Sequence, residues 1–464
     1  MKKSTIKPWH QVIQLRDEIT HQELSQKQFA ADLYDVVMGR NPGVYHDPRE
    51  FFALTYPTVR LRDLARDVTH RLAGQSEKAL RQLHTPFGGG KTHALITLVH
   101  LARDPAHLPD VPAVSQFKAH CALASGWPKA RIAAVVFDRL DAERGMAVTA
   151  PDGTERNVRM PWSAIAWQLA GPAGLKLLKD DGAERPSPPA TGVMEELLTL
   201  ASQEGSGVLI LFDEVLWFVR VMADLDPAWI GRMREFMHSL TQAVAKVPRC
   251  CLVASLLASD PHKQDELGKH ISKELYDEFK RLADEGIQPV ESQDVSEILR
   301  RRLFKLDSHA DRSQWPGPVF GALNGVQAVD EYTARNRAAE EKRYTDAYPF
   351  HPALIETLYQ KWTQLEGFQQ TRGILKTLAS ALRDAVQWDA LSLIGAQVFL
   401  VDPRMEGLGV AARELANVAR LEQYEGKRQD WTAILEAELG HARKAQEGLL
   451  GVRQREIEQA VMAT

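Results

Sequence analysis

The stretch HTPFGGGKTHALITLVHLA (residues 84–102) sets three consecutive glycines and a Lys-Thr pair directly before an apolar helical pattern. A short segment at residues 79–84 precedes the glycines and predicts a strand. Where a loop joins a strand to a helix, backbone N–H groups and the positive end of the helix dipole favour a bound anion. The stretch therefore predicts a phosphate-binding loop at the edge of an α/β sheet.

The loop ends as a P-loop does, because Gly90, Lys91 and Thr92 match the end of the pattern GxxxxGK[ST]. In that motif the lysine reaches the β- and γ-phosphates, and the hydroxyl coordinates Mg²⁺. Thr85 stands where the first glycine is expected, while the later glycines allow a close approach of the backbone. The alternative is a glycine turn with a solvated lysine. The residues predicted to contact ATP are Thr85, Pro86, Phe87, Gly88, Gly89, Gly90, Lys91, Thr92 and His93.

Further strand patterns follow the loop and alternate with helical patterns. They are RIAAVVFD (131–138), GVLILFD (207–213), CCLVASLL (250–257) and the short IQPV (287–290). Short apolar runs between helices are typical of a parallel sheet covered on both faces, so the fold class is α/β. Pro289 cannot donate to a sheet ladder, which predicts an edge position for the last strand. The next strand pattern along the chain is QVFLVD (397–402).

The remaining segments are predicted to be helical. Before the sheet, Ser25 is a candidate N-cap for a helix that Gly39 ends, and a second helix covers residues 59–72. The polar tail after Leu421 is also predicted to be helical and has no stop signal, so we expect that the chain is a fragment of something longer. The predicted domains are an N-terminal helical region (1–75), an α/β core (76–292), a helical lid (293–390) and a C-terminal region (391–464).

An acidic pair ends the apolar strand at residues 207–213. Asp213 is predicted to hold Mg²⁺, and Glu214 to polarise the water that attacks the nucleotide. Alone, an Asp-Glu pair at this point is better explained as a helix cap. Together with a P-loop in the same sheet, it predicts a site for nucleotide hydrolysis at the carboxyl edge.

Three residues are candidates for supporting roles. Ser255, at the tip of its strand, would position the water, or simply end the strand. Arg281 precedes the edge strand and would reach a neighbouring subunit as an arginine finger; surface solvation is the alternative. Arg372 lies in the first turn of a helix, against the helix dipole, so a γ-phosphate is a candidate partner.

Other motifs have simpler explanations. Arg300, Arg301 and Arg302 cannot all face one way on a helix and are predicted to form a solvated or interdomain face. The histidines of the loop and its helix lack the partners of a metal site. Aromatic residues upstream of the loop could wall an adenine, although core packing is the commoner role: Tyr45, Phe51, Phe52 and Tyr56.

Composition excludes several classes of protein. The 464 residues carry a net charge of −4, so there is no global basic footprint for nucleic acid. Three cysteines form neither a zinc pattern nor a disulfide framework. The first residues lack the apolar core of a signal peptide, and no apolar run is long enough to span a membrane. We expect a cytoplasmic protein without a membrane segment.

Several segments together resemble a known family. The sequence is similar to the large AAA+-type ATPases of bacterial and archaeal phage-defence islands, which are related to the ATPase of BREX-type systems. The resemblance covers most of the chain to about residue 420, and PFGGGKTH is its most specific part. The matching segments are WHQVIQLRDE, FAADLYDVV, YHDPREFFALTYPT, PFGGGKTH, PWSAIAWQLAG, LILFDEV, RRRLF, YPFHPALIETLYQKW and QTRGILKTLA.

The resemblance implies an AAA+-like P-loop NTPase with a helical lid. Lys91 and Thr92 would be Walker A residues, Asp213 and Glu214 Walker B residues, and Arg372 a sensor in the lid. Inserted helices are expected around residues 161–171. The implied partners are a further copy of the chain and a DNA methyltransferase, helicase or nuclease of the same defence system, with DNA contacted through them.

The sequence thus predicts an ATPase that couples turnover to assembly or remodelling of a complex on DNA. Glu214 favours this function, since a pure switch has less need of a general base. The alternative is a nucleotide-gated scaffold that recruits a methyltransferase or nuclease with negligible turnover, which the near-neutral charge favours. A phosphotransferase is a weaker alternative, because no acceptor site can be identified.

Overall fold

The computed structural model describes residues 6–21, 31–41, 43–84, 90–124, 126–256, 266–280, 286–360, 370–419, 423–424, 427–428, 431–452 and 454–464. Contacts divide the chain into two compact units. The sheet unit is Ala31–Val290, and the helical unit combines Met1–Ala30 with Glu291–Thr464.

A parallel sheet organises the sheet unit. Its strands are β1 (Leu80–Leu83), β2 (Ala130–Val136), β5 (Gly207–Asp213) and β6 (Cys250–Ser255), in the order β1-β6-β5-β2. All three neighbouring pairs run parallel. The predicted α/β class with a parallel sheet is confirmed.

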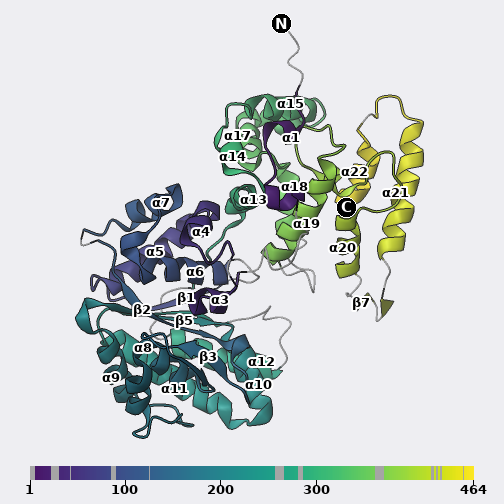
Figure 1. The fold of residues 1–464 in the computed structure, drawn as a ribbon. Helices are drawn as coiled ribbons and strands as arrows, with labels where there is room; N and C mark the ends of the chain where they lie inside the picture. Colours follow the sequence, from purple (N-terminus) through teal and green to yellow (C-terminus); the bar gives the residue numbers. More distant parts are fainter. Residues whose placement is uncertain are drawn as a thin grey trace. The chain divides into compact units, whose positions relative to one another are not determined.

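Helices cover both faces of this sheet (Figure 1). One face packs on α3 (Leu33–Met38), α4 (Pro48–Leu54), α5 (Val59–Leu72), α6 (Lys91–Arg103) and α7 (Pro112–Cys121). The other packs on α8 (Pro161–Leu178), α9 (Thr191–Ala201), α10 (Val215–Leu225), α11 (Ala228–Lys246) and α12 (Glu266–Lys280). Alternate residues of β5 enter the two cores, which is why the strand is apolar up to Asp213 at its end.

Arg71 of α5 ties the two layers together. Its buried guanidinium donates to the carbonyls of Val244, Ala245 and Val247 at the end of α11, each at 3.0 Å, and to Cys250 of β6 at 2.9 Å. The last carbonyls of a helix have no partner within the helix, and a cation there also complements the dipole. One side chain thus caps a helix of one layer from a helix of the other.

Local signals account for several boundaries. Gly39, in the left-handed region with φ of 67°, ends α3 as predicted, and Asp32 caps its start; Ser25 lies outside the described residues. The segment 287–290 joins the edge of the sheet beside β1 as predicted, but forms one bridge, between Leu83 and Ile287, instead of a strand. Pro289 follows that bridge and has no N–H with which to continue the ladder.

An antiparallel hairpin between β2 and α8 was not predicted. It pairs β3 (Met146–Thr149) with β4 (Glu155–Val158). The apolar alternation of Met146 and Val148 and the turn around Gly153 were the available signals. The helix that follows, α8, lies where an inserted helix was expected, around residues 161–171, and has a break at Gly171.

The helical unit joins distant parts of the chain. Its N-terminal part contains α1 (Trp9–Val12) and α2 (Asp17–His21). Trp9 donates through Nε1 to Oδ2 of Asp389 at 2.8 Å, and through its backbone to the carbonyl of Leu391 at 2.9 Å. The first residues therefore belong with a segment synthesised almost 400 residues later.

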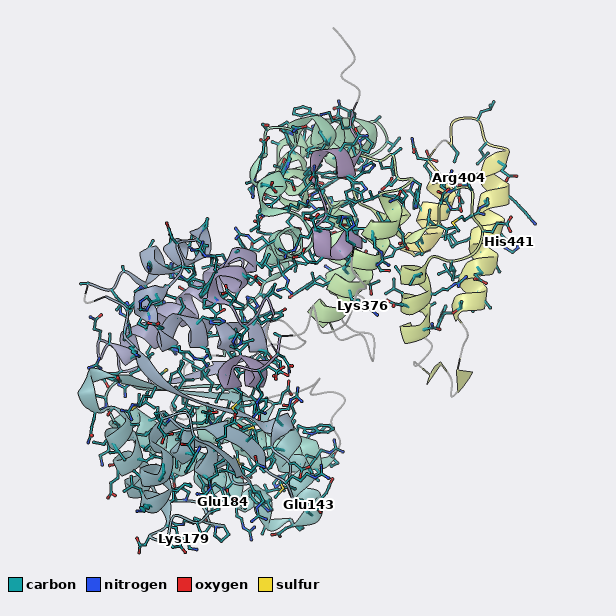
Figure 2. The ribbon with its side chains drawn as sticks, in the orientation of Figure 1. Glu143, Lys179, Glu184, Lys376, Arg404 and His441 are labelled. Carbon is teal, nitrogen blue, oxygen red and sulfur yellow. The ribbon has the colours of Figure 1, made fainter. Side chains whose placement is uncertain are left out.

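The rest of the helical unit follows the sheet unit in sequence. Its helices are α13 (Val295–Leu303), α14 (Leu306–Ala310), α15 (Pro316–Gln327), α16 (Glu331–Arg335), α17 (Arg337–Ala347), α18 (Pro352–Gln360), α19 (Gln370–Ala385), α20 (Val410–Ala419), α21 (Trp431–Glu447) and α22 (Glu456–Ala463). A short antiparallel hairpin separates α20 from α21. Its strands, β7 (Gln423–Tyr424) and β8 (Lys427–Arg428), have two residues each. Lys376 of α19, which Figure 2 labels, donates to Glu414 of α20 at 2.9 Å.

The strand predicted at residues 397–402 is wrong. Ala396–Phe399 form a 3-10 turn, in which buried Gln397 donates to the carboxylate of Asp389 and to the carbonyl of Leu393. A side chain that bonds its own neighbourhood holds the segment as a turn, although its composition is that of a strand. The helices predicted after Leu421 are present as α21 and α22.

The unit boundary at residues 290 and 291 lies close to the core–lid boundary predicted at 292 and 293. Residues 31–75, assigned by sequence to a separate N-terminal region, pack through α3, α4 and α5 in the same core as the sheet. Within the described ranges, no helix combines the length and apolar character that crossing a bilayer requires.

His100 makes the stability of the sheet unit depend on pH. Its buried ring donates from Nε2 to the carbonyl of Tyr45 at 2.9 Å, and burial lowers its pKa from 6.5 to about 4. The unfolded chain therefore binds more protons between these values, so stability falls as the pH is lowered through them. We expect wild type to lose about 2–3 kcal/mol more than His100→Gln between pH 7 and 4.5, measured by urea denaturation. Equal losses in both proteins would contradict this.

Candidate functional site

The carboxyl ends of the parallel strands meet at one edge of the sheet. Strand register places Val136 of β2 beside Asp213 of β5, and Leu83 of β1 beside Ser255 of β6. In open α/β sheets, ligands bind outside this edge where neighbouring strands lead to opposite faces. Here β1 leads to α6 on one face and β6 to α12 on the other, so the edge has the required topology.

Gly90 and Lys91 begin the helix after the glycine loop. Gly90 has φ of 80°, which a residue with a Cβ rarely adopts, and α6 starts at Lys91. Lys91 is only 8% exposed. The preceding loop residues Thr85, Pro86, Phe87, Gly88 and Gly89 lie outside the described residues.

A hydrogen bond joins the helix to the acidic strand end. Oγ1 of Thr92 donates to Oδ2 of Asp213 at 2.9 Å. The two residues come from the first turn of α6 and the last position of β5, and are 121 residues apart in sequence. The Lys-Thr pair and the acidic pair, predicted independently, therefore lie together.

Asp213 is almost completely buried. Burial raises its pKa to about 6, although the bond from Thr92 and the charge of Lys91 act in the opposite direction. Within the described residues, its Oδ1 and the hydroxyl of buried Ser255 have no hydrogen-bond partner of standard geometry. Ser255 is nevertheless close enough to lower the pKa of Asp213. Buried polar atoms of this kind are rare in native folds and need an explanation.

Glu214 has an unusual backbone conformation. Its φ of 59° and ψ of 38° lie in the left-handed region, where a residue with a long side chain is uncommon. It stands between the end of β5 and the start of α10. Burial raises its pKa to about 7, and the neighbouring charge of Asp213 adds to the effect. Backbone strain and perturbed acidity on one residue are typical of functional sites.

A third carboxyl group, Asp138, was not selected from the sequence. It lies two residues after the end of β2, in the 3-10 turn Phe137–Arg139, and its charge raises the pKa of both Asp213 and Glu214. Although part of the side chain is exposed, burial of the rest raises the pKa of Asp138 itself. The signal was available, since the predicted strand 131–138 ends in Asp as the strand 207–213 does.

Two predicted arginines cannot be placed beside this cluster. Arg281 lies outside the described residues. Arg372 is in the first turn of α19, in the helical unit, and its side chain is also outside them.

Comparison with known proteins identifies the family. A family model, the DUF499 N-terminal domain, matches residues 6–294. The chain belongs to the DUF499 family. The residues at the carboxyl edge of the sheet form an edge cluster of Thr92, Asp138, Asp213, Glu214 and Ser255. The match contains this whole cluster of the DUF499 chain and ends at residue 294, shortly after the second segment of the helical unit begins.

Other comparisons add little. No curated protein matches the chain. Among solved structures, it is similar to Cdc6p from Pyrobaculum aerophilum at 10% sequence identity, with 89% of this chain and 83% of that chain covered. The TM-score is 0.32, a similarity too low to carry an argument.

His93 of the DUF499 chain packs against the helical layer. Its Nε2 lies 3.1 Å from Oγ1 of Thr55, and its ring stacks on Phe51 with centroids 4.6 Å apart. Phe51 and Phe52 are fully buried in the core, as the core-packing alternative predicts. No group of three metal-ligating side chains occurs in the described ranges.

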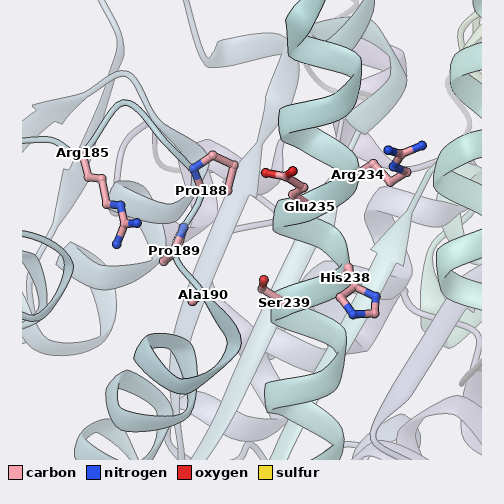
Figure 3. Close-up of a pocket in the computed structure, with 8 residues that line it drawn as sticks. All are labelled: Arg185, Pro188, Pro189, Ala190, Arg234, Glu235, His238 and Ser239. Atoms are coloured by element: carbon pink, nitrogen blue, oxygen red, sulfur yellow. The ribbon is translucent and has the colours of Figure 1, made fainter.

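A surface pocket lies elsewhere on the sheet unit (Figure 3). It is lined on one side by Arg185, Pro188 and Pro189, and on the other by residues of α11 that include Glu235. None of its lining residues was predicted as a site residue. It shares no residue with the edge cluster.

The raised pKa of Glu214 lowers the stability of the folded protein at high pH, and this effect can be measured. The folded protein retains the proton up to about pH 7, whereas the unfolded chain releases it near 4.5, so stability falls as the pH rises between these values. Glu214→Gln should be more stable than wild type by about 2–3 kcal/mol at pH 8 and show no advantage at pH 4.5. Urea denaturation at both pH values tests this, with Glu196→Gln on the surface of α9 as control. A gain independent of pH would contradict the expectation.

Proposed function

We propose that this DUF499 chain is an AAA+-type ATPase that binds ATP with Mg²⁺ and hydrolyses it. The hydrogen bond between Thr92 and Asp213, beside Glu214, carries the proposal. It connects the residues after a glycine loop to an acidic pair at a strand end, which is the arrangement that phosphoryl transfer uses.

The phosphate chain of ATP would be held at the start of α6. Backbone N–H groups of the loop and the helix dipole favour its negative charge, and Lys91 adds a cation at the same end of the helix. The proposed contact set remains Thr85 to His93, with His93 supporting the helix through Thr55.

The residues present fit a bound Mg²⁺. The hydroxyl of Thr92 and the carboxylate of Asp213 are oxygen donors of the kind that magnesium prefers, and Oδ1 of Asp213 has no partner in the described chain. When bound, the ion neutralises part of the charge on the phosphates. A nearby cation also favours the charged form of Asp213, whose pKa burial raises.

Glu214 is proposed to take the proton of the attacking water. Its pKa near 7 lies close to the operating pH, where a general base is most effective. Ser255, whose buried hydroxyl has no hydrogen-bond partner of standard geometry among the described residues, is proposed to help hold that water. Arg281 from a neighbouring copy and Arg372 from the lid are proposed to stabilise charge in the transition state.

We further propose that turnover serves assembly or remodelling of a complex on DNA in a phage-defence system. This part is supported by the resemblance of the sequence to the ATPases of defence islands. The proposed partners are further copies of the chain and a DNA methyltransferase, helicase or nuclease.

A nucleotide-gated scaffold is the second candidate. A specific observation favours it: the net charge of −4 leaves no global basic footprint for nucleic acid, which favours action through a recruited partner. Such a chain would bind ATP and recruit its partner while hydrolysing little.

Kinetics of two variants test the proposal. Glu214→Gln should lower ATP turnover by at least about 100-fold with little change in ATP binding, because it removes only the base. Lys91→Ala should weaken ATP binding at least about tenfold, because it removes a charge on the phosphates. Turnover is measured with and without duplex DNA, with Glu196→Gln as control.

The outcomes separate the candidates. Turnover that persists in Glu214→Gln would overturn the proposed role of this residue. Tight ATP binding by wild type, without turnover under either condition, would favour the scaffold.

The pH profile provides an independent test of the cluster. Asp138→Asn removes a like charge, so the pKa of Glu214 should fall and activity should persist to lower pH. We expect the ratio of turnover at pH 6 to that at pH 8 to rise about two- to threefold. Asp224→Asn, on the exposed side of α10, is the matched control. An unchanged ratio would mean that Asp138 does not act on the base.

A further inference from the structure

A pocket of about 340 Å³ lies in the sheet unit, between α11 and the loop that precedes α9 (Figure 3). The loop contributes Arg185, Pro188, Pro189 and Ala190, and α11 contributes Arg234, Glu235, His238 and Ser239. Pockets for small molecules have volumes of roughly 300–1,000 Å³, so this one accommodates a ligand at the small end of that range. Its ligand is separate from ATP, because none of these residues belongs to the edge cluster.

The loop wall of the pocket is anchored to the start of α8. Oε1 of Glu184 accepts from two consecutive backbone N–H groups just before α8, at 2.8 and 3.2 Å. Nε1 of Trp162, in the first turn of α8, donates to the carbonyl of Arg185 at 2.7 Å. The rings of Pro188 and Pro189 restrict the backbone further along the loop. A wall that is in place before a ligand arrives lowers the entropic cost of binding.

The two walls of the pocket carry opposite charges. Within the described ranges, the guanidinium of Arg185 bonds only to the hydroxyl of Ser187, through Nε at 3.0 Å, so both of its Nη groups are available. The carboxylate of Glu235 has neither an ion pair nor a hydrogen bond with any residue that the structure describes. Arg234 is different, because its Nη1 donates to Glu274 at 2.9 Å. Arg185 and Glu235 therefore offer a cation and an anion to a ligand in the same cavity.

Figure 3 shows which lining side chains are directed into the pocket. The carboxylate of Glu235 and the hydroxyl of Ser239 point from α11 toward the loop, whereas Arg234 and His238 point away from it. On the loop side, two proline rings add apolar surface beside Arg185. The pocket thus combines an anion and a hydroxyl on one wall with a cation and apolar surface on the other.

We infer that this pocket binds a small zwitterion of the amino-acid class. The carboxylate of the ligand binds Arg185, since a guanidinium with available Nη groups forms two parallel hydrogen bonds to a carboxylate. The ammonium group of the ligand donates to Glu235 and to the hydroxyl of Ser239 on the opposite wall. The methylene groups between the two charges pack on the proline rings, which removes apolar surface from water.

The charge pattern of the pocket disfavours other common classes of ligand. A phosphate ester or a nucleic acid would bring negative charge toward the carboxylate of Glu235, and a polyamine would bring positive charge toward Arg185. A simple carboxylate or a simple amine would use one wall and leave the charge of the other wall without a partner. A zwitterion complements both walls at once.

Saturation-transfer NMR of the full chain with a series of ω-amino acids tests the inference. The series is glycine, β-alanine, γ-aminobutyrate and ε-aminohexanoate, which differ only in the number of methylene groups between ammonium and carboxylate. Because α11 and the anchored loop hold Arg185 and Glu235 apart, one length should bind at least about tenfold more tightly than the weakest member. The carboxylate and the amine that match the best ligand but lack its second charge should bind at least about tenfold more weakly than it does.

Substitutions on the two walls complete the test. Arg185→Gln and Glu235→Gln should each weaken binding of the best ligand at least about tenfold, because each removes one charge. Arg234→Gln is the matched control, since this side chain lines the same pocket but points away and pairs with Glu274, and it should bind the ligand as wild type does. No binding of any ω-amino acid at millimolar concentration, or equal binding by wild type and all three variants, would overturn the inference. Inorganic phosphate that binds through Arg185, while no ω-amino acid binds, would also overturn it.

Discussion

Burial of a parallel sheet on both faces is the constraint on which the candidate site depends. Every residue of β5 from Gly207 to Asp213 is buried, so the strand must remain apolar until it reaches the edge. Asp213 is its first ionisable side chain, and the bond from Thr92 offsets part of the cost of placing a carboxylate there. Because β2 and β6 end at the same edge, Asp138 and Ser255 are brought to the same place.

The edge cluster is costly for the fold. Burial raises the pKa of Asp213, Glu214 and Asp138, the charge of Asp138 raises the pKa of the other two further, and Glu214 also has a strained backbone. Packing elsewhere has to compensate, and much of it comes from the two helical layers that Arg71 connects. A ligand with positive charge would reduce the free-energy cost of burying these carboxylates. Such local costs are expected at a functional site.

Sequence reasoning succeeded where local pattern and topology agree. The four strands of the sheet, their parallel direction and the meeting of Thr92 with Asp213 follow from apolar runs and from the geometry of parallel sheets. Sequence reasoning failed where contacts of side chains, or contacts between residues far apart in sequence, determine the local structure. Gln397 holds a turn in a strand-like segment, and Glu297 draws Arg300, predicted on a solvated or interdomain face, into the interior, where it is 3% exposed. Neither contact has a signature in the hydrophobic pattern. Asp138 could have been predicted, because it ends an apolar strand pattern in the same way as Asp213 does.

The pairing of Trp9 with Asp389 determines the order in which the chain can fold during synthesis. These residues are 380 apart, and the complete sheet unit lies between them. At about 5–20 residues per second, a ribosome needs roughly 20–80 s to add the second partner after the first. Until the residues after Val290 are made, the apolar face of α1, with Trp9 and Val12, lacks its native partners, which include Phe304 and Trp315. This N-terminal segment is therefore made before the sheet unit but can pack only after it, and in the cell it is exposed to chaperones and proteases during that wait.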